Sequence, residues 1–193
     1  EIDAALTEKQ YTGGNSSAEG LVSYIGRINY AAYQRYLFEF NLRCDGSSKF
    51  LDGSKYGYFP SASVGWIFSE EPFINKYVKG WLNHAKLRVS YGVLGNNSGV
   101  GRYEQQETLT TNNYMIDGKI LKGYVNKKMV NRDLSWEETS VTNIGLDMKF
   151  FNNRLSVELD YYDRLTSGMI RPSDMSVHLT GAYSAPRKNI GEL

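Results

Sequence analysis

The chain has 193 residues and a net charge of +1, because 22 lysines and arginines stand against 21 aspartates and glutamates. This balance excludes a strongly basic nucleic-acid binder and an acidic disordered tail, so we expect no nucleic-acid partner. The only cysteine, Cys44, excludes an intramolecular disulfide framework. Aromatic residues reach 13% of the chain, so rings carry much of its apolar surface.

The first predicted hairpin lies between residues 21 and 45. Residues 21–30 and residues 36–45 each alternate large apolar and polar side chains, and a short break at 31–34 separates the two runs. Strict alternation is the period of a β-strand with two different faces. Two such runs with a tight connection predict a β-hairpin.

Two further strands flank a predicted short helix. Residues 56–69 place small side chains on one side and large apolar ones on the other, and residues 86–93 alternate in the same way. Between them, Ser69 is followed by two glutamates and Pro72, which match an N-cap, an acidic first turn and an early proline. The sequence therefore predicts a short connecting helix that ends at about residue 79.

The stretch 99–135 is polar, has no clean period and contains Gly118 and Gly123 as breakers. It predicts a long loop with room for short strand pieces, and loops of this size usually carry function.

The clearest hairpin follows this loop. Residues 143–150 and 155–161 alternate on either side of a turn that contains two asparagines.

The predicted strands are long and their connections are uneven. They exceed the roughly 5–6 residues common in soluble sheets and approach the roughly 9–11 tilted residues that cross a bilayer. Short connections at 31–34 and 151–154 alternate with long ones at 47–55 and 95–135. This arrangement is typical of outer-membrane barrels, whereas no apolar run approaches the roughly 18–20 residues of a transmembrane helix.

Aromatic residues gather near the predicted strand ends, as they do in the interfacial girdles of a membrane barrel. They are Tyr30, Tyr33, Tyr36, Tyr56, Tyr58, Phe59, Phe150 and Phe151. A soluble antiparallel sheet with one buried face gives the same alternation. The pattern alone leaves both architectures open and slightly favours the membrane barrel.

Eight sequence motifs, taken in chain order, narrow this choice. They are RCDGSSKF (43–50), YGYFPSASVGW (56–66), KLRVSYGVLGN (86–96), NRDLSWE (131–137), NIGLD (143–147), FNNRL (151–155), DYYDR (160–164) and NIGE (189–192). In identity and order they closely resemble motifs of SusC-like TonB-dependent transporters. The resemblance covers most of residues 24–166 and the end of the chain.

The resemblance implies an all-β fold in which residues 1–193 form part of one antiparallel transmembrane β-barrel domain. The parent would be a 22-stranded outer-membrane barrel with short periplasmic turns and long extracellular loops. Only part of the later half of that barrel is matched. The N-terminal plug, the segment that engages TonB and the remaining strands are expected to lie outside this chain.

The resemblance also implies a function, namely TonB-dependent import of nutrients across the outer membrane of a Gram-negative bacterium. The substrates would be glycans or oligosaccharides, or peptides. The expected partners are a SusD-like surface lipoprotein, TonB through the absent N-terminal region, and outer-membrane lipid. Transport of this kind needs no covalent chemistry, so we expect neither enzyme activity nor a cofactor.

Within that architecture, alternate residues along each strand would face two different environments. Polar residues would face the lumen or plug, namely Glu39, Asn41, Arg43, Ser63, Arg88, Asp147, Lys149, Glu158 and Asp160. Apolar residues would face lipid, namely Phe38, Phe40, Val64, Trp66, Leu87, Val89, Ile144, Leu146, Val157 and Leu159. Aromatic residues in or near the long loop are candidate substrate contacts, namely Tyr103, Tyr114, Tyr124 and Trp136. Packing among loops is the alternative for these four, and the one we favour.

Other chemistry finds little support in the sequence. His84 and His178 are far apart and lie in no nucleophile or metal motif, so no catalytic or metal site is predicted. The segment 45–48 is either a turn or a substrate contact, and its Asp-Gly composition favours the turn. The remaining alternative to a transporter is a soluble β-sandwich that binds carbohydrate, which would bury one face of each sheet.

Overall fold

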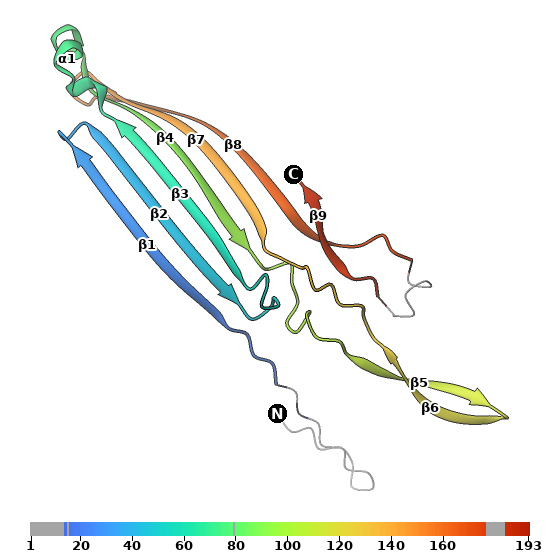
Figure 1. The fold of residues 1–193 in the computed structure, drawn as a ribbon. Coiled ribbons are helices and arrows are strands. Elements are labelled where there is room, and N and C mark those ends of the chain that lie inside the picture. The colour runs from blue at the N-terminus through green and yellow to red at the C-terminus, as the bar shows by residue number, and fades with distance from the viewer. Residues whose placement is uncertain (1–13, 15, 79, 177–183) are drawn as a thin grey trace.

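The chain forms one large antiparallel sheet and a separate two-stranded hairpin in a computed structural model that describes residues 14, 16–78, 80–176 and 184–193 (Figure 1). The seven strands of the sheet follow the order β1-β2-β3-β4-β7-β8-β9. Their bounds are β1 Leu21–Ala32, β2 Tyr36–Ser47, β3 Tyr56–Trp66, β4 Leu82–Asn96, β7 Glu137–Phe150, β8 Leu155–Pro172 and β9 Arg187–Glu192. The separate hairpin consists of β5 Leu109–Ile116 and β6 Lys119–Asn126.

Both hairpins predicted in the large sheet are confirmed. β1 and β2 pair from Leu21 opposite Ser47 to Ala32 opposite Tyr36, and β7 pairs with β8 in the same antiparallel way. The turn between β1 and β2 places Tyr33 and Gln34 at positive φ, and residues 151–153 between β7 and β8 also have positive φ. Positive φ in the turn matches the right-handed twist of the flanking strands, which explains why such short connections suffice.

A small helical segment joins β3 to β4 at the same end of the sheet as these two turns (Figure 1). It contains the 3-10 helix η1, Phe68–Glu70, and the helix α1, Pro72–Val78. The predicted short helix is confirmed, but α1 begins at Pro72 rather than directly after Ser69, and its predicted end at about residue 79 lies outside the described residues. Ser69, predicted as an N-cap, instead lies within η1, where its Oγ accepts a hydrogen bond from the backbone N–H of Ala85 at 3.0 Å.

The strand registers divide the sheet into a polar face and an apolar face. Residues directly opposite each other in an antiparallel pair point to the same side. Glu39 lies opposite Ser63, and Ser63 lies opposite Ser90. Continued across β7 and β8, this register places every residue predicted to face the lumen on the polar face, namely Glu39, Asn41, Arg43, Ser63, Arg88, Asp147, Lys149, Glu158 and Asp160.

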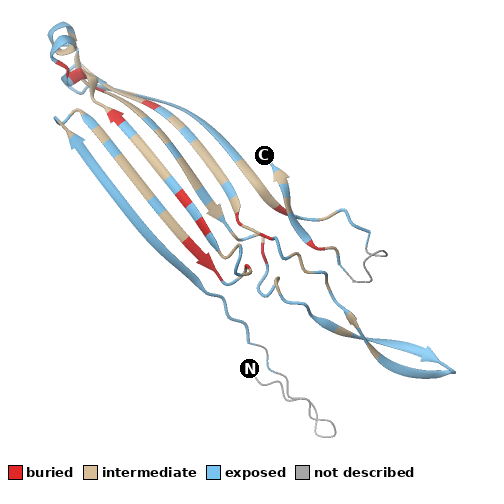
Figure 2. Ribbon diagram, in the orientation of Figure 1, coloured by how far each residue is buried: buried red, intermediate tan, exposed pale blue. Residues whose placement is uncertain are grey.

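The apolar face carries all ten residues predicted to face lipid. Phe38 lies opposite Val64, Val64 opposite Val89, and Val89 opposite Ile144. Large apolar side chains on this face remain exposed, including Ile28 at 62%, Val64 at 53% and Leu159 at 57%. Figure 2 shows that exposed and half-buried residues dominate the strands, with no second layer over the sheet in the described part of the chain.

The buried core sits at the end of the sheet that carries the long loops. It consists of Phe50, Phe59, Val100, Leu134, Trp136 and Ile170. The ring centroids of Trp136 lie 5.2 Å from Phe50 and 5.5 Å from Phe59. This core fixes the loops around 50, 100 and 135 against the strand ends.

The prediction that Phe59 belongs to an interfacial girdle is wrong. Its side chain is 3% exposed and lies on the polar face, directly opposite Arg43. The backbone makes room for the ring, because a Cβ atom at Gly57 or Gly95 would collide with it. Tyr56 and Tyr58, at 50% and 65% exposure, lie on the apolar face as a girdle requires.

The predicted long loop contains more structure than the sequence pattern indicated. β5 and β6 form a hairpin that extends beyond the sheet (Figure 1). Its turn uses Asp117 and Gly118, both at positive φ, and an Asp-Gly pair is a strong hairpin signal. The strands β4, β7 and β8 are also longer than predicted, and β9 is an additional strand at the edge of the sheet.

Candidate functional site

The polar face carries an ion-pair cluster that crosses three strands. Arg88 on β4 binds Asp147 on β7 through two hydrogen bonds of 2.8 Å, and its Nη2 lies 3.2 Å from Oδ1 of Asp160 on β8. Gly145 on β7 lies between them and directly opposite both Arg88 and Asp160. A Cβ atom at Gly145 would lie 2.8 Å from Cζ of Arg88. Glycine at this position therefore leaves room for the guanidinium.

A hollow lies beside this cluster on the same face. It has a volume of about 460 Å³, and its lining includes Glu39, Ser63, Gly65, Lys86, Arg88 and Ser90. Small side chains on β3 and β4 form its floor, while charged side chains stand on both sides. Three of the predicted lumen residues, Glu39, Ser63 and Arg88, therefore line this hollow over β1–β4, together with apolar residues that include Leu37 and Val64.

The buried carboxylate of Glu71 connects several segments at the end of the sheet that carries the short turns. Glu71 is 6% exposed and accepts hydrogen bonds from Arg35 at 2.9 Å, from the hydroxyl of Tyr36 at 2.6 Å and from the indole N–H of Trp66 at 3.1 Å. The hydrogen bonds from Tyr36 and Trp66 lower the pKa of this carboxyl, and the charge of Arg35 adds to the effect. The sequence identified Glu71 only as a first-turn acid, because its donors lie elsewhere in the chain, with Trp66 in β3, Tyr36 in β2 and Arg35 directly before β2.

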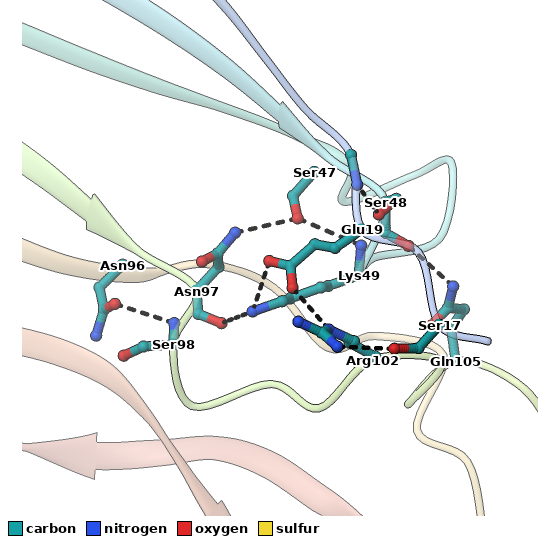
Figure 3. Close-up of polar contacts among 11 residues, drawn as sticks. Ser17, Glu19, Ser47, Ser48, Lys49, Asn96, Asn97, Ser98, Arg102 and Gln105 are labelled. Atoms are coloured by element: carbon teal, nitrogen blue, oxygen red, sulfur yellow. Dashed lines mark hydrogen bonds and ion pairs between the residues drawn. The ribbon is translucent and has the colours of Figure 1, made fainter. Parts of the chain in front are cut away.

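A second polar network gathers segments at the long-loop end (Figure 3). The hydroxyl of Ser47, which is fully buried, accepts hydrogen bonds from the side chain of Asn97 at 3.0 Å and from the backbone N–H of Lys49 at 3.3 Å. The ammonium of Lys49 donates to the carbonyl of Asn97 at 3.3 Å. The loop after β2 is thereby connected to the loop after β4.

The predicted turn at 45–48 is confirmed in part. Residues 45–47 still belong to β2, and the turn begins at Ser48. Asp45 is 4% exposed and its Oδ2 lies 2.8 Å from Nε of Arg43. The alternative reading of this segment as a substrate contact stays a prediction.

Glu19 joins this network from the segment before β1. Its carboxylate lies 3.1 Å from the ammonium of Lys49 and 3.2 Å from Nε of Arg102. Hydrogen bonds from these two cations lower the pKa of Glu19, so the carboxylate stays charged at neutral pH. No sequence motif pointed to Glu19 or Arg102, because the three charges are far apart in the chain.

Two of the four predicted loop aromatics lie near this network and the core. Trp136 is 7% exposed, packs on Phe50 and Phe59, and directs its indole N–H to the carbonyl of Lys55 at 3.4 Å. Its ring therefore holds the loops together. Tyr103 is 38% exposed, and its hydroxyl accepts a hydrogen bond from the backbone N–H of Ala18 at 2.8 Å.

The other two loop aromatics lie on the β5–β6 hairpin. Tyr114 pairs with Leu121, whereas Tyr124 pairs with Thr111. Alternation along these strands places the two rings on opposite faces of the hairpin. Tyr114 and Tyr124 are 44% and 68% exposed, so each is accessible, but they do not form one stacking surface.

The described residues contain no group of three or more His, Cys, Asp or Glu side chains that could hold a metal ion. His84 lies on β4 opposite Lys149, and His178 lies outside the described residues. Among the helices of the described chain, none has both the length and the apolar character needed to cross a bilayer.

Comparison with known proteins identifies relatives over most of the chain. No protein-family model matches it. The TonB-dependent receptor SusC of Bacteroides thetaiotaomicron is 34% identical over 195 residues, which cover 99% of this chain and 19% of the receptor. The TonB-dependent receptor P3 of Formosa agariphila is also 34% identical, over 90% of this chain and 17% of the receptor. The chain thus spans less than a fifth of the length of these relatives.

Solved structures agree with the sequence comparison. The RagAB peptide importer in its open-open state matches with a TM-score of 0.76 and 31% identity, over 97% of this chain and 20% of that one. The siderophore receptor PirA of Pseudomonas aeruginosa matches with a TM-score of 0.55 at 13% identity, over 90% of this chain and 29% of that one, which shows a shared fold alone. In sequence and in fold, this chain is therefore a homologue of one segment of the SusC-like TonB-dependent receptors.

Proposed function

We propose that the chain forms part of the wall of an outer-membrane barrel that imports glycans or peptides in a TonB-dependent manner. The apolar face of the sheet would contact lipid and the polar face would line the lumen or contact a plug. The two edge strands, β1 and β9, would pair with the remaining strands of the barrel, because unpaired edges expose backbone donors and acceptors.

The uncovered apolar face is the observation that carries this proposal. Its side chains run along all of the central strands and stay exposed, as Val64 and Leu159 illustrate. A soluble carbohydrate-binding sandwich would cover such a face with a second sheet about 10 Å away. Lipid is the natural partner for a long apolar band on strands of this length.

The two ends of the sheet support an orientation. The tight turns and α1 lie at one end, while the long loops and the β5–β6 hairpin lie at the other (Figure 1). Outer-membrane barrels have short periplasmic turns and long extracellular loops. The network of Glu19, Lys49 and Arg102 would then lie on the extracellular side, where substrate and a SusD-like lipoprotein would approach.

The similarity to SusC and to the RagAB peptide importer supports nutrient import as the activity. Energy would come through TonB, which would engage a region outside this chain. Glycans and peptides both remain within the proposed substrate range, because the imported molecule would be selected by the loops and by partner domains together.

Cell fractionation of the intact protein tests the proposal. We expect it in the outer membrane, with a faster gel mobility before boiling than after, because a closed barrel resists SDS until it is heated. Recovery as a soluble protein without a heat-dependent shift would contradict the proposal and favour the carbohydrate-binding sandwich.

A further inference from the structure

A cavity of about 410 Å³ opens beside the Glu19 network at the long-loop end. Three separate segments line it: residues 18–20 before β1, residues 48–49 after β2, and residues 102, 103, 105 and 106 after β4. The side chains that define its chemistry are Glu19, Lys49, Arg102, Tyr103 and Gln105.

The charges around the cavity leave an excess of one positive charge. Glu19 is shared between Lys49 and Arg102 at 3.1 and 3.2 Å, so one carboxylate faces two cations. Glu104, which lies in sequence between the lining residues Tyr103 and Gln105, pairs with Lys128 at 3.4 Å, so this pair adds no net charge. A carboxylate of a ligand would neutralise this excess positive charge.

The hydrogen-bonding groups of the cavity are only partly used within the described chain. Arg102 donates from Nε to Glu19 and from Nη1 to Ser17 at 2.8 Å, and a guanidinium has five N–H donors. The amide nitrogen of Gln105 donates to the carbonyl of Ser48 at 2.9 Å. Its amide oxygen is buried and receives no hydrogen bond from the described residues. That oxygen is closed off from solvent, so the cavity offers a ligand the guanidinium donors that Arg102 does not use within the described chain.

We propose that this cavity binds a carboxylate of the imported substrate. Arg102 would hold the carboxylate through guanidinium hydrogens that it does not use within the described chain, and Lys49 would add its charge. A guanidinium and a carboxylate form charge-assisted hydrogen bonds, which are among the strong hydrogen bonds in proteins. The proposal rests on the import function above and narrows its substrates to acidic ones.

Two kinds of molecule supply this chemistry, namely peptides with a free carboxylate and glycans that contain uronic acids. Titration calorimetry on the intact protein in detergent separates them when each acidic probe is compared with a neutral partner. The probes are a tetrapeptide and its C-terminal amide, and trigalacturonate and galactotriose. We expect at least one acidic probe to bind about tenfold or more tightly than its neutral partner, as a charged hydrogen bond predicts.

Substitution of Arg102 localises the effect. Arg102→Gln should remove the preference for the acidic probe, and Arg102→Lys should retain part of it. Arg132→Gln is the matched control, because Arg132 is exposed, pairs with Glu107 at 3.8 Å and does not line the cavity. The heat-dependent gel shift reports whether each variant still forms a barrel.

Equal binding of acidic and neutral probes by the intact protein would overturn the inference, as would an unchanged preference in a folded Arg102→Gln variant. Either result leaves the import function intact if the protein still fractionates with the outer membrane. Recovery of the protein in the soluble fraction would instead contradict the import function and this inference with it.

Discussion

Arg88 and Asp147 form a two-pronged ion pair across β4 and β7, with Nε to Oδ2 and Nη2 to Oδ1 both at 2.8 Å. They lie diagonally in the register, since Arg88 is opposite Gly145 and Asp147 is opposite Lys86. Diagonal neighbours lie about 7–8 Å apart, within reach of a long side chain. The pair lies on the polar face, and the next residue along β4, Val89, points to the apolar face.

This alternation predicts unequal losses of stability when the same charge is placed at neighbouring positions of β4. Val89→Lys should lower the free energy of unfolding of the intact barrel by about 2–4 kcal/mol, because it places a charge toward lipid. Ser90→Lys should cost far less, because Ser90 shares the polar face with Glu39 and Ser63. Urea unfolding in lipid vesicles measures both. Equal losses of unfolding free energy in the two variants would show that both faces contact the same environment.

A prediction on packing concerns Gly95. A methyl group there would overlap the buried ring of Phe59, which is held by Trp136 and has little room to move. We expect Gly95→Ala to destabilise the barrel by about 1–3 kcal/mol, as overpacking of a core does. Gly26→Ala is the control, because no atom lies within 4 Å of the added carbon. Equal unfolding free energies for the two variants would contradict the packing described for Phe59.

The pH dependence of stability tests the Glu71 cluster. Because hydrogen bonds from Tyr36 and Trp66 lower the folded-state pKa of Glu71, folding favours its ionised form. This contribution is fully present above the unfolded-state pKa, about 4.5, and is lost as the pH falls through the lower folded-state pKa. Glu71→Gln should reduce stability at pH 7 and flatten its decline in acid. Glu70→Gln, at the exposed neighbouring acid, should change neither.

The two-faced sheet was predictable because its signal is local. Alternation in residues such as Phe38, Glu39 and Phe40 is enough to assign faces, and the tight turns fix the register. The resemblance to known transporters added the membrane setting, which alternation alone could not supply. The exact strand ends were harder, because β8 continues past Tyr161 with a mixed polar pattern.

The long-range contacts could not be read from the sequence. Asn189 on β9 donates to the carbonyls of Ser135 and Gly168 at 2.9 and 2.8 Å, and these partners are 54 and 21 residues away. Glu19, Lys49 and Arg102 meet in the same way, from three distant segments. Such contacts depend on loop geometry, and no periodicity in the chain encodes them.

The final prediction separates a structural aromatic from an accessible one. Trp136 fills the core between Phe50 and Phe59, so Trp136→Ala should cost about 3–5 kcal/mol of stability, the range for a buried tryptophan. Tyr124→Ala, at a residue 68% exposed on the β5–β6 hairpin, should change stability by less than about 0.5 kcal/mol. Calorimetry on both variants measures substrate affinity. We expect Trp136→Ala to lose binding only to the extent that the variant is unfolded. A folded Trp136→Ala protein with normal stability and lost affinity would instead assign the indole to substrate binding.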